Sequence, residues 1–402
     1  MAGSEVEATH AGTTGISLSA AGNTISVRNR LSYSYDVRFA AEDVLSPDNP
    51  ALHDAIGGRR CLIVMGNRVG ALYGTRLLNY LRQWSDNKKF DILTLPVSEN
   101  TKSMDTVMRI CAEGKRLNLS RKSLFVAMGG GVLMDCVGLA SSIYMRKLDY
   151  VRIPTTLVGQ VDAGIGLKTG VDFEGRKNLI GTFHPPVCVL NDSHFLRTLG
   201  ADEIRNGLAE IAKMAIVSDA KLFSMLKDNS RRIVDCYTSG SDESLTRRIN
   251  VRAVMRMLEQ LQANPYETNL ERLVDFGHTF SPFLEMHTRH RIRHGQAVAM
   301  DMAISAEISC LIGRTDAEYR DSILSMLADF GLSLHDAEAF DAYRMWQSLD
   351  SIVLRRGGRL NLVIPAGPGR AEFLHEGEEL DVRTLRQALE NIAVFQTRWG
   401  FR

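Results

Sequence analysis

The 402-residue sequence lacks the features that mark several large classes of protein. No run of apolar residues approaches the roughly 18 residues that a membrane-spanning helix needs. The formal net charge is only +1, so the chain has no overall basic field for nucleic acid. We therefore expect neither a membrane nor a nucleic acid as partner, and any anionic ligand must be bound by a local cluster of cations.

Nothing in the sequence marks a secreted protein. The six cysteines are scattered without a C-x-x-C pair, and most lie in apolar surroundings (Cys61, Cys111, Cys136, Cys188, Cys236 and Cys310). Buried free thiols and a reducing cytoplasm are the expectation. Residues 1–30 lack a basic segment followed by a continuous apolar core, so they do not resemble a signal peptide and are expected to form a flexible tail.

The remaining chain changes its pattern near residue 190. Before this point strands alternate with helices, which predicts an α/β domain with a parallel sheet over residues 31–190. The expected strands are 31–40, 61–65, 90–95, 124–128 and 150–153, and the expected helices are 69–84, 104–113 and 132–144. Residues 191–402 are expected to form a mainly helical domain, with helices at 203–217, 245–261 and 297–311 and one late strand at 360–364.

A glycine turn follows the expected strand 124–128. Gly129, Gly130 and Gly131 let a backbone approach a phosphate closely, and the next helix offers free N–H groups at its start. The sequence is neither G-x-G-x-x-G nor a P-loop, so a plain tight turn remains an alternative. Asp135 lies one turn into that helix.

Three residues have the composition of an open catalytic metal site. Glu210, His278 and His294 offer one carboxylate and two imidazoles, which leaves a position for a substrate oxygen. Lys213 follows Glu210 by three residues on the same face of a helix. The alternative is that His294 merely ends a solvated basic run that begins at His287.

The segment from residue 153 to 181 is rich in glycine, lysine and small polar residues between apolar anchors. Such a composition favours a loop and hairpin that bind an oxyanion, and an ordinary exposed hairpin is the alternative. The chain resembles the dehydroquinate synthase superfamily of sugar phosphate cyclases over about residues 60–365. The resemblance lies in the order of five motifs along the chain: the glycine turn, this segment, and the surroundings of Glu210, His278 and His294.

The resemblance implies a Rossmann-like NAD-binding domain, then a mainly α-helical metal-binding domain, and a homodimer. The implied metal ligands are Glu210, His278 and His294, with zinc expected and cobalt as an alternative. The implied cofactor-binding residues are Glu99, Lys102, Gly129, Gly130, Gly131, Asp135, Thr155, Thr156 and Lys177. One departure is Gly66-Asn67-Arg68-Val69, where the family often has Asp-x-Asn-Val, so the contacts to the adenosine remain open.

The resemblance also implies the residues that act on a sugar phosphate. The catalytic group comprises Lys213, Lys168, Asp162 and Glu203, and the phosphate group comprises Arg146, Lys168, Lys177 and Asn178, with Arg146 reaching the neighbouring subunit. The implied chemistry is transient oxidation by NAD, elimination of phosphate, reduction and intramolecular aldol closure. The enzyme is then a phosphate-eliminating lyase.

Four further positions bear on which sugar is used. Where dehydroquinate synthase carries groups for a substrate carboxylate, this chain has Met257, Glu271, Asp275 and Pro282, with Arg272 adjacent. Two acidic residues bind a carboxylate poorly. The stretches Asp275-Phe276-Gly277-His278-Thr279-Phe280-Ser281-Pro282 and Val161-Asp162-Ala163-Gly164-Ile165-Gly166 resemble the family of 2-epi-5-epi-valiolone synthases, and this resemblance implies sedoheptulose 7-phosphate as the substrate.

Several alternatives stay open. A 2-epi-valiolone or desmethyl-4-deoxygadusol synthase uses the same sugar, and stereochemical outcomes do not follow from residue spacing. Dehydroquinate synthase itself and a metal-dependent polyol dehydrogenase are further alternatives. A catalytically silent binding protein is disfavoured because Glu210, His278, His294 and Lys213 are all present.

Overall fold

The structure is a computed structural model that describes residues 15–400, apart from 20–22, 30–31, 85–88, 290 and 376–379. The chain divides into two units, residues 1–35 and residues 36–402. In the first unit, β1 (Gly15–Leu18) pairs antiparallel with β2 (Ile25–Arg28). No strand was expected in this stretch. The flexible tail expected over residues 1–30 falls largely outside the described residues and stays a prediction.

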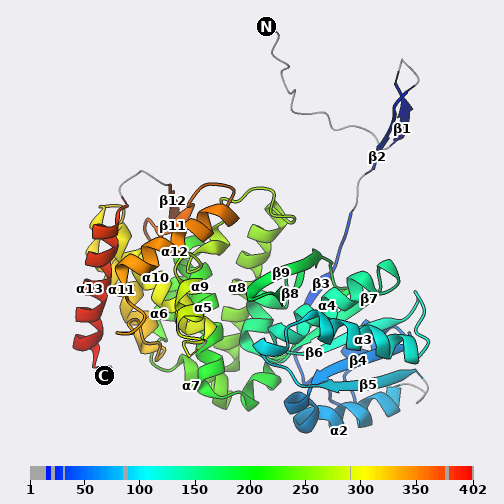
Figure 1. Cartoon of the computed structure of the whole chain (residues 1–402). Coiled ribbons are helices and arrows are strands. Elements are labelled where there is room, and N and C mark those ends of the chain that lie inside the picture. The colour runs from blue at the N-terminus through cyan, green and yellow to red at the C-terminus, as the bar shows by residue number, and fades with distance from the viewer. Residues whose placement is uncertain are drawn as a thin grey trace. The chain divides into compact units, whose positions relative to one another are not determined.

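A six-stranded parallel sheet forms the first half of the second unit (Figure 1). The strand order is β3 (Asp36–Phe39), β10 (Cys188–Asn191), β7 (Asp149–Pro154), β6 (Leu124–Gly129), β4 (Cys61–Gly66) and β5 (Phe90–Leu95). Every pair in this sheet is parallel. The parallel sheet expected from the alternating pattern is confirmed, although β3 is shorter than the strand expected at 31–40.

Helices cover both faces of this sheet. Ile63 and Val126 face one core, which is closed by α1 (Ala51–Ile56) and α2 (Asn67–Trp84). Their neighbours Leu62 and Phe125 face the other core, under α3 (Met104–Arg116) and α4 (Gly131–Ile143). Burial on both faces explains why β4 and β6 are continuous apolar runs without an alternating pattern.

The second half is helical and has its own large core. After the 3-10 turn η4 (Ser193–Thr198), its helices are α5 (Ala201–Ser218), α6 (Ala220–Asp228), α7 (Ile233–Ser239), α8 (Glu243–Ala263), α9 (Ser281–His287), α10 (His294–Leu311), α11 (Ala317–Asp329), α12 (Ala342–Arg355) and α13 (Val382–Trp399). The late strand is β11 (Leu362–Pro365), which pairs with β12 (Ala371–Leu374). The expected fold class is confirmed. The boundary at residue 190 remains a proposal, because residues 36–402 form one unit.

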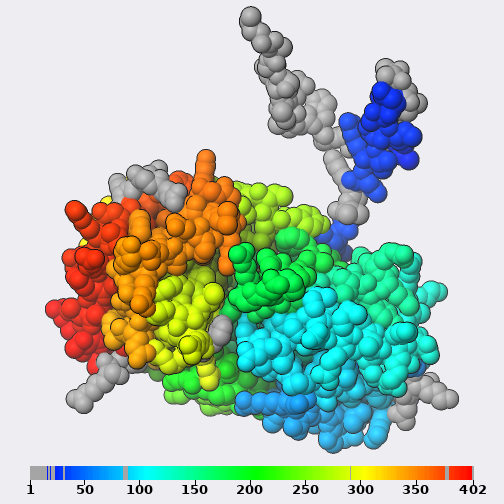
Figure 2. Space-filling model, in the orientation of Figure 1, coloured from blue at the N-terminus to red at the C-terminus, as the bar shows by residue number. Residues whose placement is uncertain are grey.

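Two short segments lie between the sheet and the helices. The π-helical turn η3 (Gly159–Ala163) contacts both α5 and α8, while the antiparallel hairpin of β8 (Lys168–Phe173) and β9 (Arg176–Phe183) packs on α4. In Figure 2 the green hairpin lies between the cyan residues of the sheet half and the yellow residues of the helical half. The hairpin expected in the segment 153–181 is therefore present.

Glycines allow the closest contacts around this junction. A Cβ on Gly207 of α5 would lie 2.4 Å from the Cβ of Leu157, and one on Gly295 of α10 would lie 2.4 Å from the Cα of Asn206. Because these approaches exclude even a methyl group, α5 packs directly against the segment after β7 and against the start of α10.

Among the helices of the described chain, none combines the length and apolar character that a membrane crossing requires.

We predict that Gly207→Ala destabilises the protein by about 1–3 kcal/mol, the usual cost of overpacking a core. The expected result is a lower midpoint of thermal unfolding followed by circular dichroism. Gly74→Ala is the matched control, because Gly74 also lies inside a helix but its Cβ would meet no atom within 4 Å. The control should be neutral or stabilising by up to about 1 kcal/mol. Equal midpoints for the two variants would contradict the tight contact.

Candidate metal and nucleotide site

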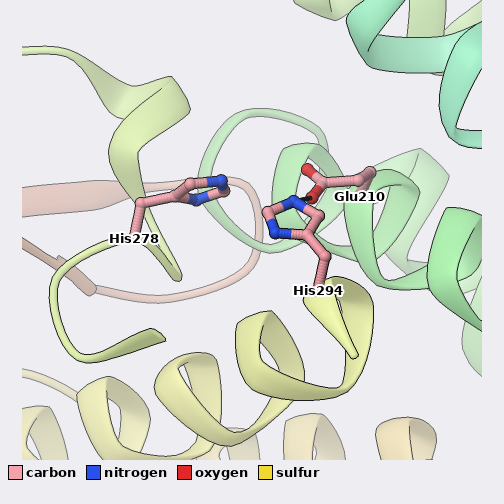
Figure 3. Close-up of side chains that lie close together, drawn as sticks. All are labelled: Glu210, His278 and His294. Atoms are coloured by element: carbon pink, nitrogen blue, oxygen red, sulfur yellow. Dashed lines mark hydrogen bonds and ion pairs between the residues drawn. The ribbon is translucent and has the colours of Figure 1, made fainter. Parts of the chain in front are cut away.

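Glu210, His278 and His294 meet in one cluster, with one ligand atom from each lying within 4.8 Å of the others. Figure 3 shows Glu210 on α5, His294 at the first residue of α10, and His278 on a loop with its ring directed toward the other two. His294 Nε2 lies 3.0 Å from Glu210 Oε1. The solvated-run alternative fails for His294, whereas His287 is exposed and His290 lies outside the described residues.

The loop that carries His278 is fixed by its backbone. Gly277 has a φ of +76°, a left-handed conformation that a residue with a Cβ rarely adopts. The buried Asp301 carboxylate then accepts hydrogen bonds from the backbone N–H groups of residues 279, 280 and 281 through one oxygen, at 2.5–2.8 Å. Asp301 therefore ties the His278 loop to α10, the helix that carries His294.

Burial and charge set the protonation of the cluster. Burial opposes ionisation of Glu210, but Lys213 and the two histidines outweigh burial and hold the pKa of Glu210 well below its ordinary value. Burial would also lower the pKa of His294, yet its hydrogen bonds to Glu210 and Glu285 raise that pKa to about 10. Burial and the nearby Lys213 lower the pKa of His278. The cluster thus combines a carboxylate, one neutral imidazole (His278) and one imidazole (His294) that two carboxylates keep protonated.

Lys213 is buried beside this cluster. Its Nζ lies 2.6 Å from Glu210 Oε2 and 3.8 Å from Asp162 Oδ1. Burial lowers the pKa of Lys213, but Asp162 and Glu210 more than compensate and the net pKa is raised. Lys213 is therefore charged at neutral pH, and η3 supplies one of the two carboxylates that surround it.

Glu285 joins the cluster to the hairpin. One carboxylate oxygen lies 3.1 Å from His294 Nδ1, and the other accepts from Lys177 Nζ at 2.6 Å. Lys177 also lies 3.4 Å from Glu99 Oε1. Burial alone would raise the pKa of Glu285, but His294 and Lys177 lower it to about 2.

The predicted nucleotide turn lies where β6 meets α4. Gly130 is the N-cap of α4 and provides no side-chain cap, so the first N–H groups of the helix have no side-chain acceptor there. A Cβ on Gly130 would lie 3.0 Å from Thr156 Cγ2, and one on Gly131 would lie 3.1 Å from Ala163 Cβ. The N–H of Thr155 donates to Gly129 O at 2.8 Å. The glycine turn and the two threonines are thus brought together.

The other predicted cofactor residues form a second charge cluster. Buried Lys102 pairs with Asp135 at 2.6 Å and donates to Asn178 Oδ1 at 2.5 Å. Burial lowers the pKa of Lys102, yet Asp135 and Glu99 raise it overall, while burial raises the pKa of Asp135. Glu99, on η1 (Glu99–Thr101), acts on both lysines: it raises the pKa of Lys102 and lies 3.4 Å from Lys177 Nζ.

Asp275, one of the residues predicted to select the sugar, belongs to an ion network. Arg272 forms a two-point pair with buried Asp275 at 2.6 and 3.1 Å, and Arg356 Nε lies 3.8 Å from the same carboxylate. Burial would raise the pKa of Asp275, but the two arginines lower it. Glu267 pairs with both Arg272 and Lys168. Asp275 is therefore neutralised by Arg272, which the sequence analysis treated only as an adjacent cation.

The remaining predicted residues are more dispersed. Met257 is buried in the helical core, and Pro282 lies in the first turn of α9. Glu203 pairs with Arg293 at 3.1 Å, directly before His294. Arg146 is exposed at the end of η2 (Tyr144–Arg146), and within the described chain no hydrogen bond or ion pair joins it to the other predicted residues. Its predicted role toward a second subunit stays a prediction.

Sequence reasoning missed the residues that support the cluster, namely Glu285, Asp301, Glu267 and Arg356. Asp301 carried a usable signal, because it is a lone acid in an apolar stretch of α10, and a buried carboxylate must find donors. Glu285 lies between the two metal-site histidines in sequence, but nothing in its spacing identifies its two partners.

The donor set fits a divalent metal, since a carboxylate and two imidazoles are the three protein ligands of an open zinc site. His278 Nδ1 lies 3.0 Å from Phe276 O, so each histidine has a partner for its second ring nitrogen. The uncapped start of α4 and the glycines, whose Cβ atoms would crowd Thr156 and Ala163, fit the pyrophosphate of a dinucleotide. The residues present therefore fit both groups.

Comparisons with known proteins agree along most of the chain. A model of the 3-dehydroquinate synthase N-terminal domain matches residues 92–206, and one of the C-terminal domain matches residues 207–351. The 2-epi-5-epi-valiolone synthase of Streptomyces glaucescens is 41% identical over 362 residues, covering 90% of this chain and 91% of that protein. The demethyl-4-deoxygadusol synthase of Trichormus variabilis is 33% identical over 348 residues, covering 85% and 84%.

A solved structure is also similar. It is ValA, a 2-epi-5-epi-valiolone synthase from Streptomyces hygroscopicus subsp. jinggangensis with NAD+ and Zn2+ bound. It has a TM-score of 0.85 and 38% sequence identity, and the match covers 92% of this chain and 99% of that chain.

We predict that His278→Ala weakens zinc binding by more than the roughly 10–100-fold that loss of a supporting partner costs, because it removes one of three ligands. Competition with a chromophoric chelator measures the affinity. His287→Ala is the control, since His287 belongs to the same histidine-rich stretch but is exposed. Equal zinc affinity in both variants would exclude the cluster as the metal site.

Proposed function

The chain belongs to the 3-dehydroquinate synthase family of sugar phosphate cyclases, and on this premise we propose that it converts sedoheptulose 7-phosphate to 2-epi-5-epi-valiolone with release of phosphate. The enzyme is then a phosphate-eliminating lyase. The observation that carries the proposal is the meeting of Glu210, His278 and His294 beside the buried Lys213. The 41% identity to a 2-epi-5-epi-valiolone synthase over 90% of the chain supports the product.

We assign the two cofactors to separate parts of the chain. Glu210, His278 and His294 would hold a divalent metal, for which zinc is our first candidate. The turn Gly129–Gly131, together with Thr155 and Thr156, would hold NAD. Bound NAD supplies reversible hydride transfer, and a bound metal polarises a substrate oxygen. In the proposed cycle of oxidation, elimination, reduction and aldol closure, the oxidation and the reduction cancel, so NAD held at this turn would be needed only in catalytic amounts.

Lys213 is the residue that we assign to proton movement. Its ammonium group is held between Glu210 and Asp162, so its position is fixed before substrate arrives. Because its pKa is raised, it enters the cycle protonated and donates to an oxygen of the sugar. Glu210 and Asp162 then stabilise the returning proton on the amine.

The substrate phosphate needs cations from the hairpin and its surroundings. Lys177 and Asn178 on β9 adjoin both the metal cluster, through Glu285, and the nucleotide side, through Lys102. Lys168 is exposed and paired with Glu267, so phosphate must compete with that carboxylate for its ammonium group. We assign Lys177 and Asn178 the more direct role.

The opposite end of the sugar meets the Arg272–Asp275–Arg356 network. Asp275 forms ion pairs with Arg272 and Arg356, and Glu267 also pairs with Arg272. An uncharged hydroxymethyl ketone needs no free cation there, whereas a carboxylate requires one. A homodimer and a cytoplasmic location complete the proposal, the first from the family resemblance and the second from the six free cysteines.

The deciding experiment offers two sugars to zinc-loaded enzyme with catalytic NAD. We expect phosphate release and a seven-carbon cyclitol from sedoheptulose 7-phosphate, and no turnover of the carboxylated 3-deoxy-heptulosonate phosphate. Free phosphate, product mass and NMR coupling constants are the measurements. Turnover of only the carboxylated sugar would make the protein a dehydroquinate synthase, and couplings of another epimer would make it a sister cyclase.

We predict that Lys213→Met lowers kcat by about 10²–10⁴-fold, the usual contribution of a positioned proton donor. Zinc binding should persist because Lys213 is not a ligand. Steady-state phosphate release gives kcat, and chelator competition gives the zinc affinity. Lys221→Met on α6 is the control, because that lysine is exposed. A kcat within about threefold of the unaltered protein would remove Lys213 from the proton transfer.

A further inference from the structure

Glu285 has two partners that belong to different halves of the fold. It is buried on α9, with one oxygen on His294 of the helical half and the other on Lys177 of the hairpin. Neither oxygen faces solvent as a free acceptor, because the side chain is only 7% exposed. A single carboxylate thus satisfies an imidazole and an ammonium group at the same time.

The contact with His294 decides which ring nitrogen faces the cluster. When Nδ1 carries the proton, it donates to Glu285 Oε1, and the lone pair of Nε2 is directed toward Glu210 and the metal site. A carboxylate on the far nitrogen of a metal-binding histidine fixes both the tautomer and the ring orientation. Glu285 therefore prepares His294 to act as a ligand.

The contact with Lys177 extends the same arrangement toward the nucleotide side. Lys177 lies between Glu285 and Glu99, at 2.6 and 3.4 Å. A chain of hydrogen bonds and ion pairs consequently runs from Glu210 through His294, Glu285 and Lys177 to Glu99. The hairpin residue assigned to phosphate or cofactor is held by the same group that orients a metal ligand.

We propose that Glu285 is a positioning residue that sets the tautomer of His294 for metal binding and, through its second oxygen, fixes Lys177 beside that site. The proposal deepens the function proposed above and rests on it for the roles of the metal and of Lys177. Both tasks need acceptors on both oxygens, which only a carboxylate provides.

Glu285→Gln separates the two tasks, because the amide has one acceptor oxygen and one donor nitrogen. If its oxygen accepts from Lys177, its nitrogen donates to His294 Nδ1 and forces the wrong tautomer. If its oxygen accepts from His294, its nitrogen faces the Lys177 ammonium group. We expect the zinc dissociation constant to rise about 10–100-fold, as for other partners of metal-binding histidines.

Lys177→Met supplies a test that a merely structural role would not meet. Alone, it leaves both the charge of Glu285 and its contact with His294 in place, so zinc affinity should stay within about threefold of the unaltered protein. Combined with Glu285→Gln, it removes the ammonium group that competes for the amide oxygen. The double variant should therefore recover part of the zinc affinity lost in Glu285→Gln, by about threefold or more.

Zinc affinity of the full-length protein, measured by chelator competition without sugar, is the readout. The matched control is Glu307→Gln, which also alters a buried carboxylate on an ion pair, with Arg320, but away from the metal cluster. It should lower the midpoint of unfolding and leave zinc affinity unchanged. Should Glu285→Gln fail to fold, Glu285→Asp keeps the charge on a side chain too short for both partners, and its zinc affinity should fall by about tenfold.

Wild-type zinc affinity in Glu285→Gln, or no recovery in the double variant, would overturn the proposal. These results are independent of turnover. If the unaltered protein binds zinc but releases no phosphate from sedoheptulose 7-phosphate, the proposed function fails while the positioning of His294 by Glu285 still stands.

Discussion

The structure depends on keeping ionised groups inside an otherwise apolar helical core. Glu210 and Lys213 are both almost fully buried on α5, where an isolated charge would cost several kcal/mol. They are tolerated because each has partners from other elements: His294 from α10 and Asp162 from η3. These partners require close helix contacts, which explains why Gly207 and Gly295 leave no room for a side chain. Packing and electrostatics are thus a single constraint at this site.

Much of the fold was predictable because local patterns dominate it. Short apolar runs located β4, β5 and β6 within one residue at each end, and the helical periodicity located α5, α8 and α10. The hairpin of β1 and β2 was missed, since its strands are four residues long in a stretch of small and polar residues. β12 was also missed, because a four-residue strand with polar positions is defined by its partner β11 more than by its own sequence.

The metal cluster was predictable from sequence because each of its members sits in a distinctive local motif, and the expected family membership is confirmed. The supporting residues were not predictable in the same way. Glu285 acquires meaning only when α9 brings it between His294 and Lys177, which are 9 and 108 residues away. Asp301 depends on three backbone N–H groups of a loop some 20 residues before it. Such contacts are properties of the tertiary structure.

The contacts of Asp275 also change the explanation for how the proposed enzyme would prefer an uncharged hydroxymethyl ketone over a carboxylate. The sequence alone suggested repulsion between a substrate carboxylate and the acids at 271 and 275. In the structure Asp275 is compensated by Arg272 and Arg356, so repulsion is weak. Under the proposed function, exclusion would arise instead because the arginines are already engaged: a carboxylate would have to replace Asp275, a buried partner held at two points. On this proposal discrimination would come from occupied cations, and loss of Asp275 would release Arg272 and Arg356 for a charged substrate.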